Sequence, residues 1–190
     1  MILAIDTSAA HCAAALLSDD GTLTTRVETM AKGQAERLMP MIATLIAESG
    51  HEMADLRGIA VGTGPGNFTG IRIGVAAARG LALGLGVPAI GVSQFDVLAQ
   101  GATLPATITL PGSRGQAYRQ HFDADGTAAA PEVFDPEKPP AEPPAPADLV
   151  AAIARIGAAR AGQPQPRPAP VYVRAADAAP PRDPAPQILP

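Results

Sequence analysis

The sequence predicts an α/β fold in which helices back a mixed sheet, and three observations support this class. The chain opens with three short apolar segments joined by turn residues, the pattern of sequential antiparallel strands. Helix-like and strand-like segments then alternate along the chain. Apolar residues make up 47% of the 190 residues, enough for a substantial core. We therefore expect antiparallel and parallel strands in one sheet.

The opening strands are expected at Ile2–Ile5, Cys12–Leu17 and Thr22–Glu28. Asp6-Thr7-Ser8 is the expected turn between the first two strands. Asp19-Asp20-Gly21 has the composition of a tight hairpin turn, so it is expected to lead into the third strand.

Two long helices are expected at Gln34–Ser49 and Thr69–Leu85, because apolar residues recur at helical spacing along one stripe of each. Pro40 lacks a backbone donor, so we expect it to kink the first helix or to mark a restart. Buried strands are expected at Ile59–Val61 and Ala89–Val92. The first stripe consists of Leu38, Met41, Ile42, Leu45 and Ile46, and the second of Ile71, Val75, Ala78 and Leu81.

The composition changes about two thirds of the way along the chain. Five of the 21 prolines precede residue 130 and sixteen follow it. We therefore predict an N-terminal lobe of residues 1–103 and a reduced, proline-rich C-terminal lobe of residues 104–190. The second part is expected to hold strands at Thr107–Leu110 and Gln116–Phe122, one more strand after Asp125-Gly126, a helix at Ala147–Ala161 and an extended segment at Val171–Arg174.

Bulk properties limit the classes of function. The formal net charge of −4 argues weakly against independent binding to nucleic acid, which usually requires a basic face. The single cysteine, Cys12, excludes an intramolecular disulfide and is expected to be a small buried side chain. We expect no membrane span and no signal peptide, and therefore a cytoplasmic protein.

Two segments could hold a phosphate. Asp6-Thr7-Ser8 follows a strand, and the loop Gly62-Thr63-Gly64-Pro65-Gly66 leads from a strand into a helix, whose N-terminus favours negative charge. The loop is neither a Walker loop nor a dinucleotide fingerprint. The triplet is more simply explained as an ordinary turn, and the glycine loop could equally be a plain strand–helix connection. The candidate phosphate-binding residues are Asp6, Thr7, Ser8, Gly64 and Gly66.

No catalytic or metal-binding cluster is predicted. The three histidines are far apart in sequence and the cysteine is alone, so no metal-ligand spacing can be recognised and no cofactor is expected. A peptidase would need a nucleophile–base pair or a metal-bound water, and the sequence indicates neither.

The second long helix is unusually rich in small residues. Each interior glycine costs about 1 kcal/mol of helix propensity relative to alanine. We therefore expect a close neighbour, either the chain's own sheet or a helix of another chain. The small residues are Gly70, Gly74, Ala77, Ala78, Gly80 and Gly84.

Three segments together resemble the TsaB/YeaZ family. They are Asp6-Thr7-Ser8, the run from Ala60 to Gly74, and Pro88-Ala89-Ile90-Gly91-Val92-Ser93. The run contains the pattern Gly-Pro-Gly-x-Phe-Thr-Gly-x-Arg-x-Gly, which is highly specific to the family. Pro170-Val171-Tyr172-Val173-Arg174 is similar to the family's C-terminal Pro-x-Tyr-x-Arg segment.

The resemblance implies a fold of the actin/Hsp70/sugar-kinase type (ASKHA, ribonuclease H-like) and a role as a non-catalytic partner subunit. It implies a TsaD-like catalytic paralogue and a TsaE-like ATPase as partners in the threonylcarbamoyl modification of tRNA, at N6 of the adenosine next to the anticodon. tRNA would be contacted only indirectly. The paralogue holds a metal with a His-x-x-x-His motif, and this sequence reads Ser93-Gln94-Phe95-Asp96-Val97 at the matching place.

The resemblance also implies that the two long helices form the partner surface, and that a homodimer can use the same helices. Arg37 and Arg72 are candidates for contacts at the rim. The alternative is an ATP-dependent phosphotransferase or nucleotide hydrolase of the same fold that uses Asp6 and the Gly64–Gly66 loop. The predicted interface residues are Arg37, Leu38, Met41, Leu45, Ile71, Arg72, Gly74, Val75 and Ala78.

Overall fold

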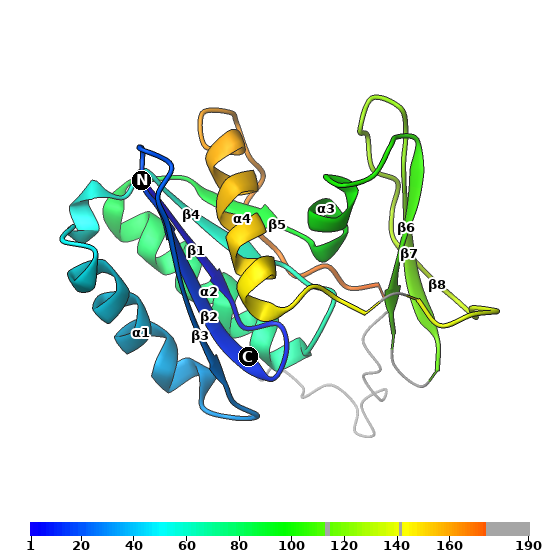
Figure 1. Cartoon of the computed structure of the whole chain (residues 1–190), viewed down its shortest axis with the longest axis horizontal. Coiled ribbons are helices and arrows are strands. Elements are labelled where there is room, and N and C mark those ends of the chain that lie inside the picture. Colours follow the sequence, from blue (N-terminus) through cyan, green and yellow to red (C-terminus); the bar gives the residue numbers. More distant parts are fainter. Residues whose placement is uncertain (113–114, 141, 174–190) are drawn as a thin grey trace, which may run out of the picture.

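The structure, a computed structural model, describes residues 1–112, 115–140 and 142–173. Two sheets organise these residues. The first has five strands in the order β3-β2-β1-β4-β5, and the second has three strands in the order β6-β7-β8. Figure 1 shows the second sheet standing beside the first, with helix α3 between them. The predicted α/β class with a mixed sheet is confirmed.

The five-stranded sheet combines both strand directions. Strands β1 (Ile2–Asp6), β2 (His11–Leu17) and β3 (Leu23–Thr29) are antiparallel neighbours, as predicted. Strand β4 (Gly58–Gly62) pairs in parallel with β1, and β5 (Ala89–Val92) pairs in parallel with β4. All residues of β1 and β4 are buried because helices cover both faces of the sheet.

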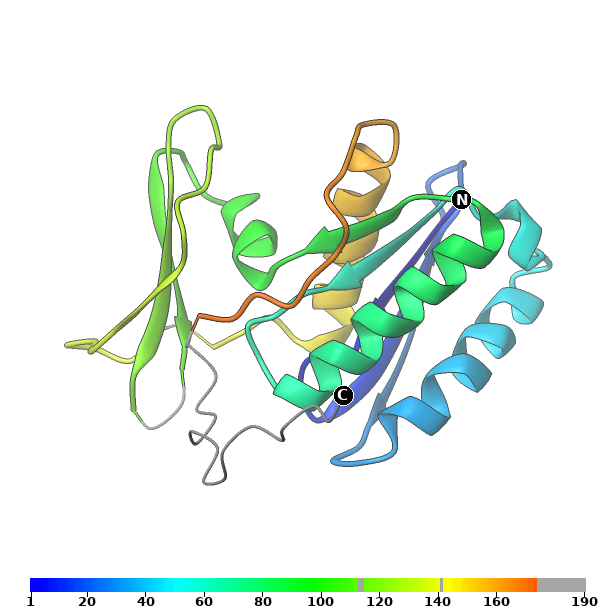
Figure 2. The same cartoon turned by 180° about the vertical axis from the view of Figure 1, so that it is seen from behind.

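Helices α1 (Gln34–Glu48) and α2 (Phe68–Leu85) cover one face of this sheet (Figure 2). Their apolar stripes form one core with the inward side chains of the strands. Helix α1 continues through Pro40 as a single helix, so the expected restart is absent. A short 3₁₀ helix, η1 (Met53–Asp55), precedes β4.

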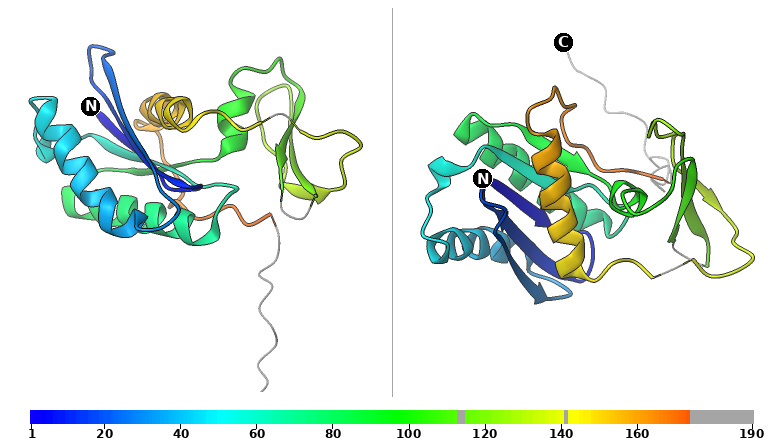
Figure 3. Two further views of the ribbon diagram at one scale, coloured as in Figure 1. Left: turned by 60° about the horizontal axis from the view of Figure 1, so that its bottom comes forward. Right: turned by 45° about the horizontal axis from the view of Figure 1, so that its top comes forward.

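Helix α4 (Pro146–Arg160) covers the opposite face and packs against β1, β2 and β4 (Figure 3). Its buried side chains, among them Leu149, Val150 and Ile153, form a second core with Ala4, Ala13 and Ala15 of the strands. The small alanines of the sheet allow the helix to approach closely. The chain therefore returns to the first sheet after it has formed the second one.

The second sheet consists of β6 (Ala106–Pro111), β7 (Ala117–Phe122) and β8 (Glu132–Phe134), all antiparallel. It packs on α3 (Gln94–Ala99) through a third, smaller core that contains Phe95, Leu110 and Phe122.

The predicted lobes, residues 1–103 and 104–190, stay a prediction. Residue 103 does lie between the two sheets, but α4 belongs to the second range and packs on the first sheet. Residues 171–173 of the predicted extended segment form no strand, although the Val171 N–H donates to the Thr63 carbonyl over 2.9 Å. Arg174, the residues after it, and Ser113-Arg114 lie outside the described residues.

One helix bears on the expectation that the chain has no membrane span. Helix α2, 18 residues from Phe68 to Leu85, is long and apolar enough to cross a membrane by length and composition. In the structure its inward face, which includes Ile71, Val75 and Ala78, packs on the five-stranded sheet. Helix α2 is therefore a core helix of this fold.

Candidate functional site

The turn Asp6-Thr7-Ser8 after β1 is completely buried, and its polar groups bond within the chain. The Asp6 carboxylate accepts hydrogen bonds from the Ser8 N–H (3.0 Å) and from the Ser8 hydroxyl (2.7 Å). The Thr7 hydroxyl donates to the Gly70 carbonyl over 2.7 Å. The turn is thus tied to itself and to the first turn of α2.

The glycine loop packs directly on this turn. The Asn67 N–H donates to the Ser8 carbonyl over 2.6 Å, and the Asn67 side chain caps α2 by accepting from the Gly70 N–H over 2.8 Å. A Cβ atom on Gly66 would lie 2.3 Å from the Ser8 carbonyl oxygen, and one on Gly70 would lie 1.9 Å from that of Thr7. Glycine is required at both positions because the two backbones nearly touch.

The structure therefore brings the two predicted phosphate-binding segments together, since Asp6–Ser8 and the loop with Gly64 and Gly66 are neighbours. It also shows what else these residues do. Their hydroxyls and carboxylate have partners within the chain. Phosphate binding by this site stays a prediction.

Two polar residues beside the turn were missed by the sequence analysis. His11 at the start of β2 is buried, and its Nε2 atom lies 3.4 Å from Asp6 Oδ1 without forming a hydrogen bond. The Gln94 amide donates to the Pro65 carbonyl over 2.8 Å and lies 3.5 Å from Ser8 Oγ. A histidine that opens an otherwise apolar strand was the available signal for His11.

In the part of the chain that the structure describes, no group of histidine, cysteine and acidic residues could hold a metal. The segment Ser93–Val97 starts α3, where the Ser93 hydroxyl and the Asp96 carboxylate form a capping box. Asp96 also accepts from Arg160 of α4 over 3.0 Å. These polar groups thus serve the packing of α3 and α4.

Cys12 is a buried thiol in β2. Burial, followed by the negative charge of Glu28, raises the pKa of Cys12 to about 11. The side chain is therefore protonated at neutral pH, as expected for a structural cysteine.

The predicted partner surface stays a prediction, but most of its residues are buried in the single chain. Seven of its nine residues point into the core beneath α1 and α2, so they cannot form a surface in this conformation. A Cβ atom on Gly74 would lie 2.8 Å from Thr7 Oγ1, so this glycine serves the chain's own packing. The seven buried residues are Leu38, Met41, Leu45, Ile71, Gly74, Val75 and Ala78.

The two arginines predicted to lie at the rim of the partner surface have partners within the chain. Arg37 forms two hydrogen bonds with the Glu28 carboxylate of β3, over 2.6 and 2.5 Å. The Arg72 guanidinium lies over the Phe68 ring, 3.7 Å from its centroid, and its Nε–H donates to the Tyr172 hydroxyl over 2.9 Å. Arg72 therefore joins the start of α2 to the segment at residues 170–173.

The outward side of α1 and α2 forms a different surface, which we call the helix face. Met39 and Phe68 are almost half exposed, and Leu83 is 86% exposed. A Cβ atom on Gly80 or Gly84 would meet nothing within 4 Å. The helix face consists of Met39, Phe68, Arg72, Gly80, Leu83 and Gly84.

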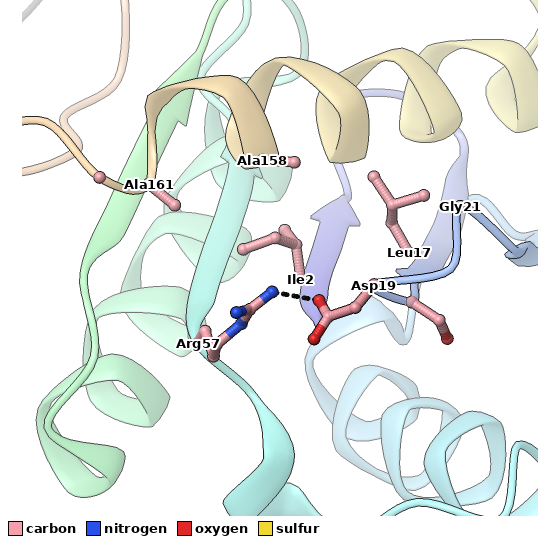
Figure 4. Close-up of a pocket in the computed structure, with 9 residues that line it drawn as sticks. Ile2, Leu17, Asp19, Gly21, Arg57, Ala158 and Ala161 are labelled. Atoms are coloured by element: carbon pink, nitrogen blue, oxygen red, sulfur yellow. Dashed lines mark hydrogen bonds and ion pairs between the residues drawn. The ribbon is translucent and has the colours of Figure 1, made fainter.

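A separate groove of about 590 Å³ lies between α4, the β2–β3 turn and the start of β4 (Figure 4). Ile2, Leu17 and Ala158 form its apolar side, and an ion pair of Asp19 and Arg57 lies at its edge. A hydrogen bond from the N-terminal amine, 2.7 Å away, lowers the pKa of Asp19. This groove contains none of the predicted site residues.

Comparisons with known proteins agree on one family. The model of the family described as "TsaD: tRNA N6-adenosine threonylcarbamoyltransferase" matches residues 27–142. The chain is 45% identical over 101 residues to the Escherichia coli "tRNA threonylcarbamoyladenosine biosynthesis protein TsaB", a match that covers 53% of this chain and 43% of that protein. It is 34% identical to an uncharacterized protein of Mycobacterium tuberculosis, across 94% of both chains.

Among solved structures, YeaZ from Pseudomonas aeruginosa superposes with a TM-score of 0.70 at 27% identity, covering 90% of this chain and 98% of that chain. The matches to the TsaB proteins of Escherichia coli and Haemophilus influenzae cover 43% and 42% of those proteins, so this chain spans less than half of their length.

The mixed sheet, the helices on both of its faces and the turn after β1 define an α/β domain of the actin/Hsp70/sugar-kinase type. Within that class, the chain belongs to the TsaB/YeaZ family.

Proposed function

We propose that this chain is a non-catalytic partner subunit in the biosynthesis of tRNA threonylcarbamoyladenosine. It binds and activates a TsaD-like catalytic paralogue together with a TsaE-like ATPase, in the cytoplasm, for modification at N6 of the adenosine next to the anticodon. Family membership supports the pathway, because relatives carry this pathway in their names. The net charge of −4 supports contact with tRNA only through the partners.

The observation that carries the proposal is the helix face. Three of the four large hydrophobic side chains found exposed among the described residues lie on two neighbouring helices, at Met39, Phe68 and Leu83. Exposed apolar side chains gathered on one face are typical of a protein–protein interface. The bare backbone at Gly80 and Gly84 leaves room for a partner helix to approach closely.

A second copy of the chain is the competing occupant of the helix face. A homodimer and a complex with the catalytic paralogue would cover the same residues, so each excludes the other. Concentration and relative affinity then decide which assembly forms.

The proposed lack of catalysis is supported by the surroundings of Asp6. The carboxylate accepts hydrogen bonds from both the Ser8 N–H and the Ser8 hydroxyl. At the position where the paralogue has its histidine pair, this chain has the capping box of α3. The lone chain is therefore expected to transfer no threonylcarbamoyl group to tRNA.

A charge on the helix face tests the proposal. Leu83→Glu places a carboxylate where the side chain is 86% exposed, so the isolated fold should be retained. We expect association with the TsaD-like paralogue of the same host to weaken at least about 30-fold, as for the loss of an apolar anchor at an interface. Isothermal titration calorimetry measures this affinity, and light scattering after gel filtration measures the homodimer.

The matched control is Ala147→Glu, which adds the same charge at an exposed position of α4, on the opposite face of the sheet. It should leave both associations unchanged. Unchanged affinity of the Leu83→Glu chain for the paralogue would show that the helix face is not the interface.

A further inference from the structure

We propose that a groove at the C-terminal end of α2 binds an extended, acidic peptide segment of another protein through two arginines. The groove has a volume of about 530 Å³. The last turns of α2 form one wall, and residues 165–168, which follow α4, form the other. Figure 2 shows this later segment, drawn in orange, passing β5, and a Cβ atom on Gly91 of β5 would lie 3.5 Å from Pro168 Cα. Parts of the chain that are far apart in sequence therefore build the groove.

Both charged side chains that line the groove are cations. Arg79 belongs to α2 and Arg167 to the later segment, and both are exposed. Neither forms a hydrogen bond or an ion pair with another described residue, whereas Arg37, Arg72 and Arg160 each have a partner within the chain. A guanidinium presents its N–H donors in one plane, an arrangement that fits a carboxylate. The groove therefore offers two carboxylate-binding groups.

The walls of the groove are basic, although the whole chain has a formal net charge of −4. Helix α2 contains no aspartate or glutamate, and neither do residues 161–173, the described residues after α4. The C-terminal end of a helix carries partial negative charge, so the two arginines, and not the backbone of α2, must hold an anionic group here. An acidic occupant meets both cations without a competing carboxylate from either wall, and this charge complementarity selects an acidic partner.

The floor of the groove is apolar. Ala82 and Pro168 are buried, Val87 is half-buried, and Leu83 is 86% exposed at the rim. A free phosphate would bind the arginines but leave this apolar surface uncovered. A nucleic acid is a polyanion that the net charge of the chain repels. The combination of cations and an apolar floor therefore fits a peptide in which an apolar side chain is flanked by acidic ones.

Prolines order the wall that carries Arg167. Every second residue of this stretch is a proline, which fixes φ, so little conformational entropy is lost when a ligand binds. The Gln163 N–H donates to the Arg160 carbonyl over 3.0 Å at one end of the stretch. The hydrogen bond from Val171 to Thr63 holds the other end. The prolines are Pro164, Pro166, Pro168 and Pro170.

The groove adjoins the helix face but does not depend on the proposed function. Gly80 and Leu83 belong to both surfaces, whereas Arg79 and Arg167 lie outside the helix face. A short peptide tests the groove on the lone chain, without the catalytic paralogue. Failure of the peptide to bind therefore leaves the proposed function standing, and a helix face that binds no paralogue leaves the groove proposal standing.

Fluorescence anisotropy with the full chain tests the proposal. The probe is the fluorescein-labelled peptide Glu-Asp-Leu-Asp-Glu, and the control probe is its neutral counterpart Gln-Asn-Leu-Asn-Gln. We expect saturable binding of the acidic peptide with a Kd of about 100 μM or lower. The neutral peptide should bind at least about tenfold more weakly, because it cannot form charge-assisted hydrogen bonds with the arginines.

Arg79→Gln and Arg167→Gln should each weaken binding of the acidic peptide at least about fivefold. Both positions are exposed, so the fold should be retained. The matched control is Arg155→Gln, which removes the same charge from an exposed position of α4, on the opposite face of the sheet. This control chain should bind the peptide like the native chain.

Three results would overturn the proposal. The first is the absence of a saturable signal at about 1 mM of the chain, and the second is equal binding of the acidic and neutral peptides. The third is an Arg155→Gln chain that loses as much affinity as the two groove variants. Competition with inorganic phosphate and with a single-stranded uridine oligonucleotide completes the test, because tighter binding of either than of the acidic peptide would also overturn it.

Discussion

Two glycines of α2 that look alike in the sequence have opposite surroundings. Gly74 faces the sheet, where a Cβ atom would lie 2.8 Å from Thr7 Oγ1 and 3.4 Å from a methyl group of Val61. Gly80 faces outward, where a Cβ atom would meet nothing within 4 Å. The first glycine is required by packing, whereas no contact within the chain requires the second, which weakens the isolated helix.

Alanine at these two positions should change the free energy of unfolding in opposite directions. Gly74→Ala is expected to destabilise the chain by about 1–3 kcal/mol, because the added methyl group overpacks a closed site. Gly80→Ala is expected to stabilise it by about 0.5–1 kcal/mol through helix propensity alone. Urea denaturation measures both values, and a stabilising Gly74→Ala would contradict the packing described here.

At the scale of the elements, two ion pairs join α1 to β3 in addition to the apolar stripe of α1: Arg37 with Glu28, and Arg26 with Glu48. Arg37 bonds both oxygens of the Glu28 carboxylate. The hydrogen bonds from Arg37 hold the pKa of Glu28 below its ordinary value of 4.5. A carboxyl group with a lowered pKa stabilises the fold above its unfolded pKa and loses that contribution as the pH falls through its folded pKa.

Replacement of Arg37 with methionine should therefore lower stability at pH 7 more than at pH 3. The free energy of unfolding of the native chain is expected to exceed that of the Arg37→Met chain at neutral pH. This difference should shrink as the pH falls from about 5 through the lowered pKa of Glu28. Denaturant titrations at several pH values measure this difference. Lys32→Met is the control, because Lys32 is exposed and takes part in none of the ion pairs between described residues. An Arg37→Met deficit that does not vary with pH would contradict the role of the ion pair.

At the scale of the whole molecule, α4 joins a late part of the described chain to the sheet that the first part forms. The helix lies far along the sequence, yet its side chains close the second face of a sheet built from residues 2–92. Arg160, at its end, donates to the Gly91 carbonyl and to Asp96. Loss of α4 packing should therefore lower the stability of the first sheet.

Ile153→Ala is expected to destabilise the whole chain by about 2–4 kcal/mol, because Ile153 is fully buried between α4 and the sheet. Hydrogen exchange should become faster for the amides of β1 and β2, which lie under α4. Val133→Ala, in the short strand β8, is the control and should leave these amides unchanged. Unchanged protection of β1 and β2 in the Ile153→Ala chain would mean that α4 is not part of the same unit.

Most elements could be predicted because local patterns specify them. The observed bounds of α1 and α2 differ by one residue from those expected, and β5 has the bounds that were predicted. Apolar spacing, the cap residue Asn67 and the turn at Asp19-Asp20-Gly21 carry this information within a few residues. The predicted partner surface could not be located in the same way, because an apolar stripe marks the side that is buried without showing what covers it.

The sequence by itself determined the order and type of the elements and the family motif, since these depend on neighbours along the chain. Only the tertiary structure decided which side of α1 and α2 is free, that α4 completes the first sheet, and that Ser8, His11 and Gln94 line one cavity. The physical reason is how far apart along the chain the interacting residues are. Helical and strand periodicity arise from contacts a few residues apart, whereas burial at Gly74 or a missing partner at His11 results from residues that only the fold brings together.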